Sequence, residues 1–223
     1  MAKRMCFISL DNVNVYDEKI ISFTYYSGFA LIQKQKSIQS LHENIIRELP
    51  NLNVLEISSK SFDSLGRELS AFNLKYNYNG QKISVENIFQ ASKTFELGGP
   101  YVDLLYKTPI EAKKDSRLTS SGELKKFIFN DIVYPLLPRT LFYDWIYCNA
   151  LKMNPSLVAQ IKNYNVFTDI EFNHEKSINC QARSVAIFVG LLKNGLLEKA
   201  LSNIENFKKI VYKDKPIQLT LFD

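Results

Sequence analysis

The most informative stretch of the chain is SVENIFQASK, residues 84–93. Ser84 is a suitable N-cap, and a helix is predicted from there to about residue 97, where two glycines and a proline end it. At about 100° per residue, Glu86, Gln90 and Lys93 would lie within roughly 60° of one another. The opposite side of this helix carries apolar residues: Val85, Ile88, Phe89 and Phe95. One face therefore belongs to the core, and the other presents a carboxylate, an amide and an amine in one column.

That polar column has two interpretations, and spacing alone leaves both open. It can be a solvated face with a weak intrahelical salt bridge. It can also be a reactive site, because a lysine that loses water on burial loses proton affinity and becomes a nucleophile. A carboxylate two turns away would then orient the amine or shuttle protons.

The remaining patterns predict an α+β fold that is predominantly helical. Short strands are expected at residues 5–10, 21–26 and 53–57, and the pair Asn79-Gly80 indicates a hairpin. A capping box begins a helix at Thr108. Further helices are expected at residues 37–49, 121–130, 140–152, 155–162, 178–193 and 198–210. Neither regular βαβ alternation nor a GxGxxG motif is present, which disfavours a Rossmann domain.

The composition narrows the class of protein. The 223 residues suit one large domain, or one domain with an added lobe. The net charge of +5 permits contact with a polyanion but does not require it, and a dedicated DNA-binding domain would usually show a denser basic face. Three dispersed cysteines and two isolated histidines indicate neither a disulfide framework nor a metal site. With no stretch long enough to span a bilayer, we expect a cytoplasmic protein without membrane contact, metal or cofactor.

Three motifs in order resemble the core of the NADAR family, which is named for its link to NAD and ADP-ribose. Residues 69–73 (LSAFN) correspond to a short "LSNFY"-like strand of that family. Glu86, Phe89, Gln90, Ala91 and Lys93 match its "EHxFQAxKF" helix; Pro109, Glu111, Ala112, Lys113 and Arg117 match its "SPxEAKxxGR" helix. The resemblance implies a NADAR/YbiA-like catalytic core at 63–211, a small strand-containing lobe at 1–62 packed on it, and an extended tail at 212–223.

Four more segments resemble one branch of this family. They are residues 33–42, 55–61, 142–147 and 167–184. That branch is encoded beside guanine-specific DNA ADP-ribosyltransferase toxins of the DarT type. The chain departs from members nearer the riboflavin-linked glycosidases, which carry an Asp and a Trp-Gly pair after a strand. Here Asp169 and Glu171 both remain candidates for the acidic role, and no Trp-Gly follows them.

The resemblance implies a DNA ADP-ribosylguanine glycohydrolase that acts as antitoxin to a DarT-type toxin, with ADP-ribosylated DNA as substrate. The alternatives are an N-glycosidase of a riboflavin-pathway intermediate and a non-catalytic protein that binds ADP-ribose or the toxin. In the enzymatic interpretation Lys93 is the nucleophile, Glu86 is an acid or base or holds Lys93 in place, and Asp169 or Glu171 stabilises positive charge or activates water.

The residues expected to bind ADP-ribose fall into three groups. Arginines suit the diphosphate, a helix start attracts anions, and aromatic rings stack on adenine, although such arginines and aromatics more often serve as surface ion pairs or core. The full set is Ser58, Ser59, Lys60, Ser70, Phe72, Asn73, Gln90, Tyr101, Arg117, Trp145, Phe167, Asn179, Gln181 and Arg183. Ser177 is the candidate N-cap of the helix after residue 178.

Two features outside the core are candidates for contacts with larger partners. The end of the chain, Gln218-Leu219-Thr220-Leu221-Phe222, resembles the peptide by which bacterial proteins bind the replicative sliding clamp, although a packed terminal segment is the simpler interpretation. The lysine pairs at 113–114, 125–126 and 208–209 either follow a DNA backbone or only aid solubility.

Overall fold

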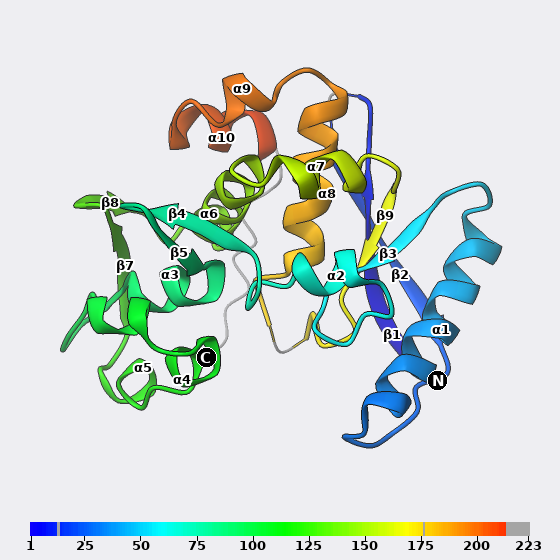
Figure 1. Cartoon of the computed structure of the whole chain (residues 1–223), viewed down its shortest axis with the longest axis horizontal. Coiled ribbons are helices and arrows are strands. Elements are labelled where there is room, and N and C mark those ends of the chain that lie inside the picture. The colour runs from blue at the N-terminus through cyan, green and yellow to red at the C-terminus, as the bar shows by residue number, and fades with distance from the viewer. Residues whose placement is uncertain (13, 176, 213–223) are drawn as a thin grey trace.

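A computed structural model describes residues 1–12, 14–175 and 177–212 (Figure 1). The helices are α1 Leu31–Glu48, α2 Ser64–Glu68, α3 Val85–Ala91, α4 Pro109–Lys113, α5 Arg117–Ser120, α6 Leu141–Lys152, α7 Pro155–Ile161, α8 Gln181–Lys193, α9 Leu197–Ala200 and α10 Ile204–Val211, with a 3₁₀ turn, η1, at Val102–Tyr106. The strands are β1 Ala2–Ser9, β2 Tyr16–Phe23, β3 Val54–Glu56, β4 Lys75–Tyr78, β5 Gln81–Ser84, β6 Lys93–Phe95, β7 Leu124–Phe129, β8 Ile132–Tyr134 and β9 Val166–Thr168. Helices hold more residues than strands, so the predicted α+β class is confirmed.

The largest sheet has the strand order β2-β1-β9-β3. Phe167 in β9 lies opposite Phe7 of β1 in antiparallel register and opposite Leu55 of β3 in parallel register. The predicted N-terminal lobe and the predicted core therefore share one sheet, because β9 comes from far beyond residue 62.

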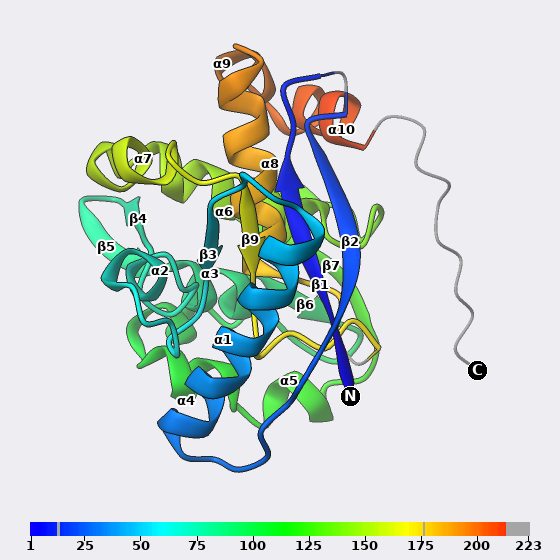
Figure 2. The same ribbon diagram turned by 90° about the vertical axis from the view of Figure 1, so that its right-hand side faces the viewer.

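Successive residues of β1 point to opposite faces of this sheet. Cys6 packs in a cluster with Ile38 and Leu41 of α1, whereas Phe7 belongs to the larger core that contains α8. Figure 2 shows α1 on one side of the sheet and α8 on the other. Both faces of the sheet are thus covered.

A second sheet, of order β6-β7-β8, corrects two predictions. Residues 124–129 form a strand and not a helix, and Phe127 and Phe129 alternate into the core. Asn130 and Asp131 both have positive φ, of 52° and 61°, as a tight hairpin turn requires. The turn chemistry and the period-two pattern of phenylalanines, together with the partner strands, outweigh the helical propensity of the lysines in this stretch.

The helix that begins at Ser84 is also shorter than predicted. It ends at Ala91, and Lys93–Phe95 continues as β6 against β7. The change occurs at Ser92, whose carbonyl accepts a hydrogen bond of 2.8 Å from the backbone N–H of Ile128. Lys93 therefore does not share the helical column of Glu86 and Gln90.

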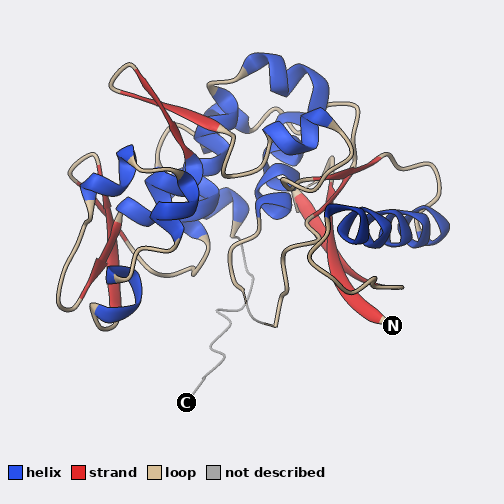
Figure 3. Ribbon diagram, turned by 60° about the horizontal axis from the view of Figure 1, so that its bottom comes forward, coloured by secondary structure: helices blue, strands red, loops and turns tan. Residues whose placement is uncertain are grey.

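Other boundaries follow from caps and turns. The hairpin at Asn79-Gly80 and the capping box at Thr108 are confirmed. The predicted helix at 198–210 is two helices, because Asn203 caps α10 by accepting a hydrogen bond from Asn206. The tail that resembles a clamp-binding peptide, residues 218–222, lies outside the described residues. Figure 3 shows helices and strands interleaved along the described chain.

One glycine fixes how closely α8 approaches the turn before β2. A Cβ placed on Gly190 would lie 1.8 Å from the carbonyl oxygen of Val15. A side chain at this position would push the helix and the sheet apart.

We therefore expect Gly190→Ala to lower the free energy of unfolding by about 3 kcal/mol, as overpacking of a backbone contact does. Urea denaturation of the purified variant measures this. Lys209→Ala, on the exposed side of α10, is the control and should change stability by less than about 0.5 kcal/mol. Equal stability of Gly190→Ala and wild type would mean that the close contact with Val15 is not formed.

Candidate functional site

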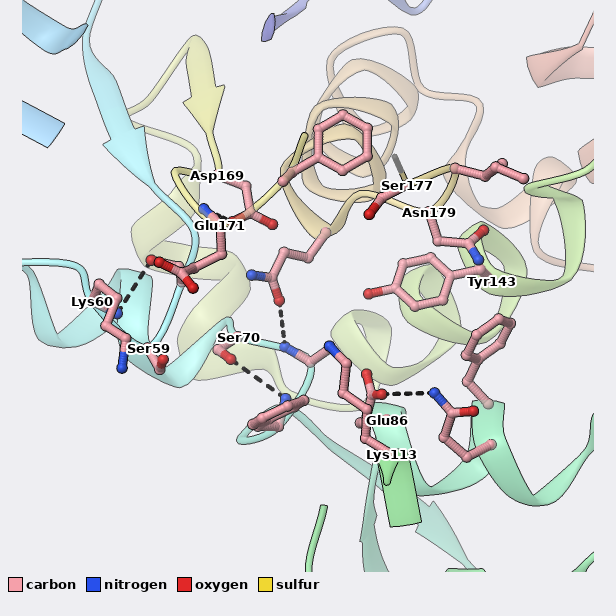
Figure 4. Close-up of a pocket in the computed structure, with 18 residues that line it drawn as sticks. Ser59, Lys60, Ser70, Glu86, Lys113, Tyr143, Asp169, Glu171, Ser177 and Asn179 are labelled. Carbon is pink, nitrogen blue, oxygen red and sulfur yellow. Dashed lines mark hydrogen bonds between the residues drawn. The ribbon is translucent and has the colours of Figure 1, made fainter. Parts of the chain in front are cut away.

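A pocket of about 530 Å³ lies where the end of the large sheet meets α3, α4 and α8 (Figure 4). Its lining comes from the loop after β3, the turn after α2, the four helices α3, α4, α6 and α8, and the segment between β9 and α8. The lining residues are Ser58, Ser59, Lys60, Ser70, Ala71, Phe72, Glu86, Phe89, Gln90, Lys113, Tyr143, Asp169, Glu171, Phe172, Ser177, Ile178, Asn179 and Gln181. In Figure 4, Asp169 and Glu171 lie on one side, and Glu86 and Lys113 lie on the other.

Many residues singled out in the sequence meet in this pocket. The group comprises Glu86, Asp169, Glu171, Ser58, Ser59, Lys60, Ser70, Phe72, Gln90, Asn179 and Gln181. They come from segments more than 120 residues apart in the sequence, so only the fold brings them together.

Arg117 and Tyr101 lie elsewhere, in an ion-pair cluster. The guanidinium of Arg117 bonds Asp103 at 2.7 Å and Asp115 at 2.8 Å, and it stacks on the Tyr101 ring at 4.4 Å. The hydroxyl of Tyr101 bonds Ser121. Arg117 is thus already paired with two carboxylates. Neither Arg117 nor Tyr101 lines the pocket.

Three more predicted residues are committed to packing or to internal bonds. Arg183 forms an ion pair with the buried carboxylate of Asp144. Trp145 packs edge-on against Phe207 at 5.6 Å. Phe167 is fully buried in the large sheet. Arg183 and Trp145 therefore join α6 to α8 and α10. None of these three side chains lines the pocket, and neither does the exposed Asn73, whose amide donates to the Arg67 carbonyl.

Lys93 lies beside the pocket and does not line it. Its Nζ is 4.8 Å from the ring centroid of Phe89, which does line the pocket. Burial lowers the pKa of the Lys93 ammonium, the positive charge of Lys113 lowers it further, and Glu86 opposes both. Within the described ranges Lys93 makes this cation–π contact and no ion pair.

Asp169 is the buried carboxyl group of the pocket wall. It follows β9 directly and is 7% exposed. Burial first, and then repulsion from Glu56, raises the pKa of Asp169 to about 8. This carboxyl group therefore keeps its proton at neutral pH, whereas a solvated aspartic acid would lose it.

Glu56, at the end of β3, is the partner that sequence reasoning did not identify. Its two oxygens accept hydrogen bonds from the Thr168 hydroxyl at 2.6 Å and from the Ile170 N–H at 2.8 Å. Burial raises its pKa as well. The sequence feature that could have indicated Glu56 is its position as an acidic residue at the end of an apolar strand, in the run NVLEI, residues 53–57.

A buried histidine extends this network to α1. The Nε2 atom of His42 lies 2.9 Å from the Thr168 hydroxyl oxygen. Since the hydroxyl proton of Thr168 goes to Glu56, Nε2 must be the donor to Thr168. Burial lowers the pKa of His42 to about 4, so the ring is neutral, in agreement with this assignment.

Gln181 joins the walls of the pocket. Its amide oxygen accepts from the Ala71 N–H at 2.8 Å, and its amide nitrogen donates to the Ile57 carbonyl at 2.6 Å. It is the first residue of α8, and Cys180 occupies the N-cap position. The predicted N-cap role of Ser177 is therefore wrong; Ser177 lines the pocket.

Two pocket-lining amides keep an oxygen without a partner. Gln90 donates to the Glu86 carboxylate at 2.8 Å, but its own Oε1 is buried and accepts no bond from the described residues. The Oδ1 atom of Asn179 is in the same situation. Buried acceptors without a partner are costly, so these atoms suit the hydroxyl or N–H groups of a ligand.

Several lining residues were not predicted as site residues. They are Ala71, Phe89, Lys113, Tyr143, Phe172, Ser177 and Ile178. Lys113 is the notable one, because its exposed side chain places Nζ 5.2 Å from the ring centroid of Phe72. Its place on α4, one turn after the capping box, was the available signal.

A comparison with protein families gives one match over nearly the whole chain. The matching family model is described as DarT1-associated NADAR antitoxin and covers residues 2–219. The chain therefore belongs to the NADAR family, in the branch of antitoxins associated with DarT1. A comparison with curated proteins gives no match.

Two classes of feature are absent from the part of the chain that the structure describes. No group of three His, Cys, Asp or Glu side chains there is arranged to hold a metal ion. None of its helices is long and apolar enough to cross a bilayer.

Gln181 offers a test of how the pocket is held together. We expect Gln181→Met to lower the free energy of unfolding by about 2 kcal/mol or more, because a backbone N–H and a backbone carbonyl lose their partners. Thermal and urea unfolding measure this. Gln39→Met, on the exposed face of α1, is the matched control. A variant as stable as wild type would show that Gln181 does not join these segments.

Proposed function

We propose that this protein hydrolyses the N-glycosidic bond between ADP-ribose and guanine in DNA, and so reverses the modification made by a DarT1-type toxin. Membership of the DarT1-associated antitoxin family supports the biological role. The observation that carries the chemical proposal is the burial of the Asp169 carboxyl group in the wall of the pocket, which raises its pKa and favours its protonated form.

Cleavage of a glycosidic bond needs a proton for the leaving group and stabilisation of positive charge on the sugar. In this proposal Asp169 gives its proton to the departing base. Glu86, on the opposite side of the pocket, faces the anomeric carbon and offsets the developing positive charge (Figure 4). Glu171 also lines the pocket, but its side chain is partly exposed and its ion pair with Lys34 keeps it from the sugar.

Lys93 is the proposed nucleophile. As the bond to guanine breaks, its neutral amine attacks the anomeric carbon and passes one proton to the Asp169 carboxylate, which has just protonated the base. The second amine proton goes to the ring oxygen as the ribose opens to an imine, and water hydrolyses this imine to release ADP-ribose and the free lysine. The lowered pKa of Lys93 favours the neutral amine. Because Lys93 packs against the Phe89 ring and does not line the pocket, the attack requires a change of side-chain rotamer at one of these two residues.

Binding of the ADP-ribose moiety would use the polar groups that remain open in the pocket. The amide oxygens of Gln90 and Asn179 suit ribose hydroxyls. Lys60 and Lys113 are the lining cations suited to the diphosphate, in place of the ion-paired Arg117. Phe72 offers a half-exposed ring for stacking.

The nucleophile is tested with Lys93→Ala and an oligonucleotide that carries ADP-ribosylated guanine. Loss of the amine should slow release of ADP-ribose, followed by mass spectrometry, on the order of 10⁴-fold, as loss of a nucleophile does in other enzymes. Borohydride added during turnover should leave an adduct on the peptide that contains Lys93.

Lys114→Ala is the matched control, since this exposed lysine lies near the pocket without lining it. Wild-type release by Lys93→Ala, or an adduct mapped to Lys113, would overturn the assignment. The same assay separates the other functions. A non-catalytic ADP-ribose-binding protein would bind ADP-ribose without releasing it from DNA. A riboflavin-pathway glycosidase would act on free nucleotide intermediates alone.

The pH dependence of the rate tests the acid. Activity should fall as the pH rises through about 8, because Asp169 then loses the proton that it must donate. Glu56→Gln removes a repelling carboxylate, so the pKa of Asp169 falls and the loss of activity should begin at lower pH. Measurement of kcat from about pH 5 to about pH 10 follows this fall, because that range covers ordinary and shifted carboxyl groups.

The other titratable groups near Asp169 are Glu171, Tyr143, Tyr147 and Cys180, and all of them remain in Glu56→Gln. Glu43→Gln, on the exposed side of α1, serves as control. If the Glu56→Gln variant is slower at every pH but loses activity at the same pH as wild type, Glu56 has only a structural role.

A further inference from the structure

The loop between β2 and α1, with the first turn of α1, presents exposed apolar side chains. Tyr26 is 40% exposed, Phe29 is 103% exposed, and Leu31 and Ile32 are each more than half exposed. In Figure 1 this loop and the start of α1 project at the lower edge of the molecule. Large apolar side chains grouped on one surface segment indicate an interaction site.

Cations lie among these rings. Arg4 and Lys34 both stand over the Tyr25 ring, at 5.9 Å and 5.6 Å from its centroid, and Lys36 lies 6.0 Å from that of Tyr26. Residues 24–36, TYYSGFALIQKQK, contain no acidic residue. We call Arg4, Tyr25, Tyr26, Phe29, Lys34 and Lys36 the basic–aromatic rim.

The rim is attached to the segment that carries the acidic residues of the pocket. Arg4 donates to the Ile170 carbonyl at 3.4 Å, and Lys34 pairs with the Glu171 carboxylate at 3.1 Å. Lys34 also donates to the Tyr25 hydroxyl at 3.1 Å. A hollow of about 280 Å³, lined by Met1, Ala2, Thr24 and Tyr25, lies beside the same ring. Material that leaves the pocket past Glu171 therefore meets the rim first.

This combination fits a nucleic-acid strand better than a protein. Proteins that bind single strands combine cations for the phosphates with aromatic rings on which bases stack. A protein partner with an acidic surface would satisfy the cations but would not explain why Tyr25 and Tyr26 each lie beside one. The substrate of the proposed activity is itself a polyanion, and a modified base must leave the base stack to enter a pocket.

We propose that the basic–aromatic rim binds the DNA strand next to the modified guanine, so that the substrate is an unpaired or locally opened strand and not a free nucleoside. This inference rests on the proposed function and adds to it the form of the substrate. Phe29 and Tyr26 stack on flanking bases, and Lys36 with Arg4 contacts phosphates. Because the ion pair between Lys34 and Glu171 is partly exposed, a phosphate can compete for Lys34.

The test measures the activity of wild type and of one double variant on two substrates. The substrates are ADP-ribosylated guanosine and a single-stranded oligonucleotide of about 12 nucleotides with one ADP-ribosylated guanine, within the usual site sizes of single-strand binders. Wild type should show a higher kcat/KM for the oligonucleotide, and the preference should shrink as salt is added. Phe29→Ala/Lys36→Ala should lower kcat/KM for the oligonucleotide by about 10-fold, with a much smaller effect on the nucleoside.

Tyr106→Ala/Lys162→Ala is the matched control, since it removes an exposed aromatic ring and an exposed cation outside the rim and the pocket lining. Thermal unfolding checks that both double variants fold. Fluorescence anisotropy with unmodified single-stranded DNA provides a readout without catalysis, in which only the rim variant should lose affinity.

Equal kcat/KM values of the rim variant and wild type for the oligonucleotide, or equal affinity for unmodified DNA, would overturn the proposal. If the rim variant instead loses only its binding to a DarT1 toxin, the surface is a protein interface and the proposal is wrong. Absence of release from either substrate by wild type, together with weaker DNA binding by the rim variant, would reject the glycohydrolase activity and support the rim.

Discussion

Glu56 connects the two parallel strands of the sheet at the edge where the pocket lies. Its carboxyl group accepts hydrogen bonds from Thr168 and Ile170, and its proximity raises the pKa of Asp169. A buried carboxyl group is expensive unless hydrogen bonds surround it, and the parallel register of β3 and β9 supplies those donors. The position and the protonation of Asp169 both depend on this arrangement, and so does the chemistry proposed for the pocket.

The same strands explain why an N-terminal region accompanies the core. β3 contributes Glu56, α1 contributes His42 to the hydrogen-bond network, and the loop after β3 contributes Ser58 to the lining. The N-terminal segment is thus a structural part of the pocket, since β9 lies between β1 and β3. Gln181, at the start of α8, likewise bonds both the end of β3 and the turn after α2.

Local chemistry could be predicted from the sequence, and pairing between distant segments could not. The capping box at Thr108 and the turn at Asn79 depend on a few neighbouring residues, and both were predicted correctly. The end of the helix at Ala91 and the strand at Leu124–Phe129 depend on each other, because β6 pairs with β7 directly after the helix ends. For the pocket, motif matches gave most of the polar lining. Arg117 was misplaced because its carboxylate partners become neighbours only in the folded chain.

The order of strands in the large sheet has a consequence for synthesis of the protein. β1 and β2 leave the ribosome well before β9, the other neighbour of β1, which is more than 150 residues further along. Such non-local pairing closes a large loop, and it slows folding relative to a chain with local contacts. Until translation passes residue 168, β1 has an open edge, and such edges invite pairing with other chains. The lysine and arginine at positions 3 and 4 provide charge on this edge during that interval.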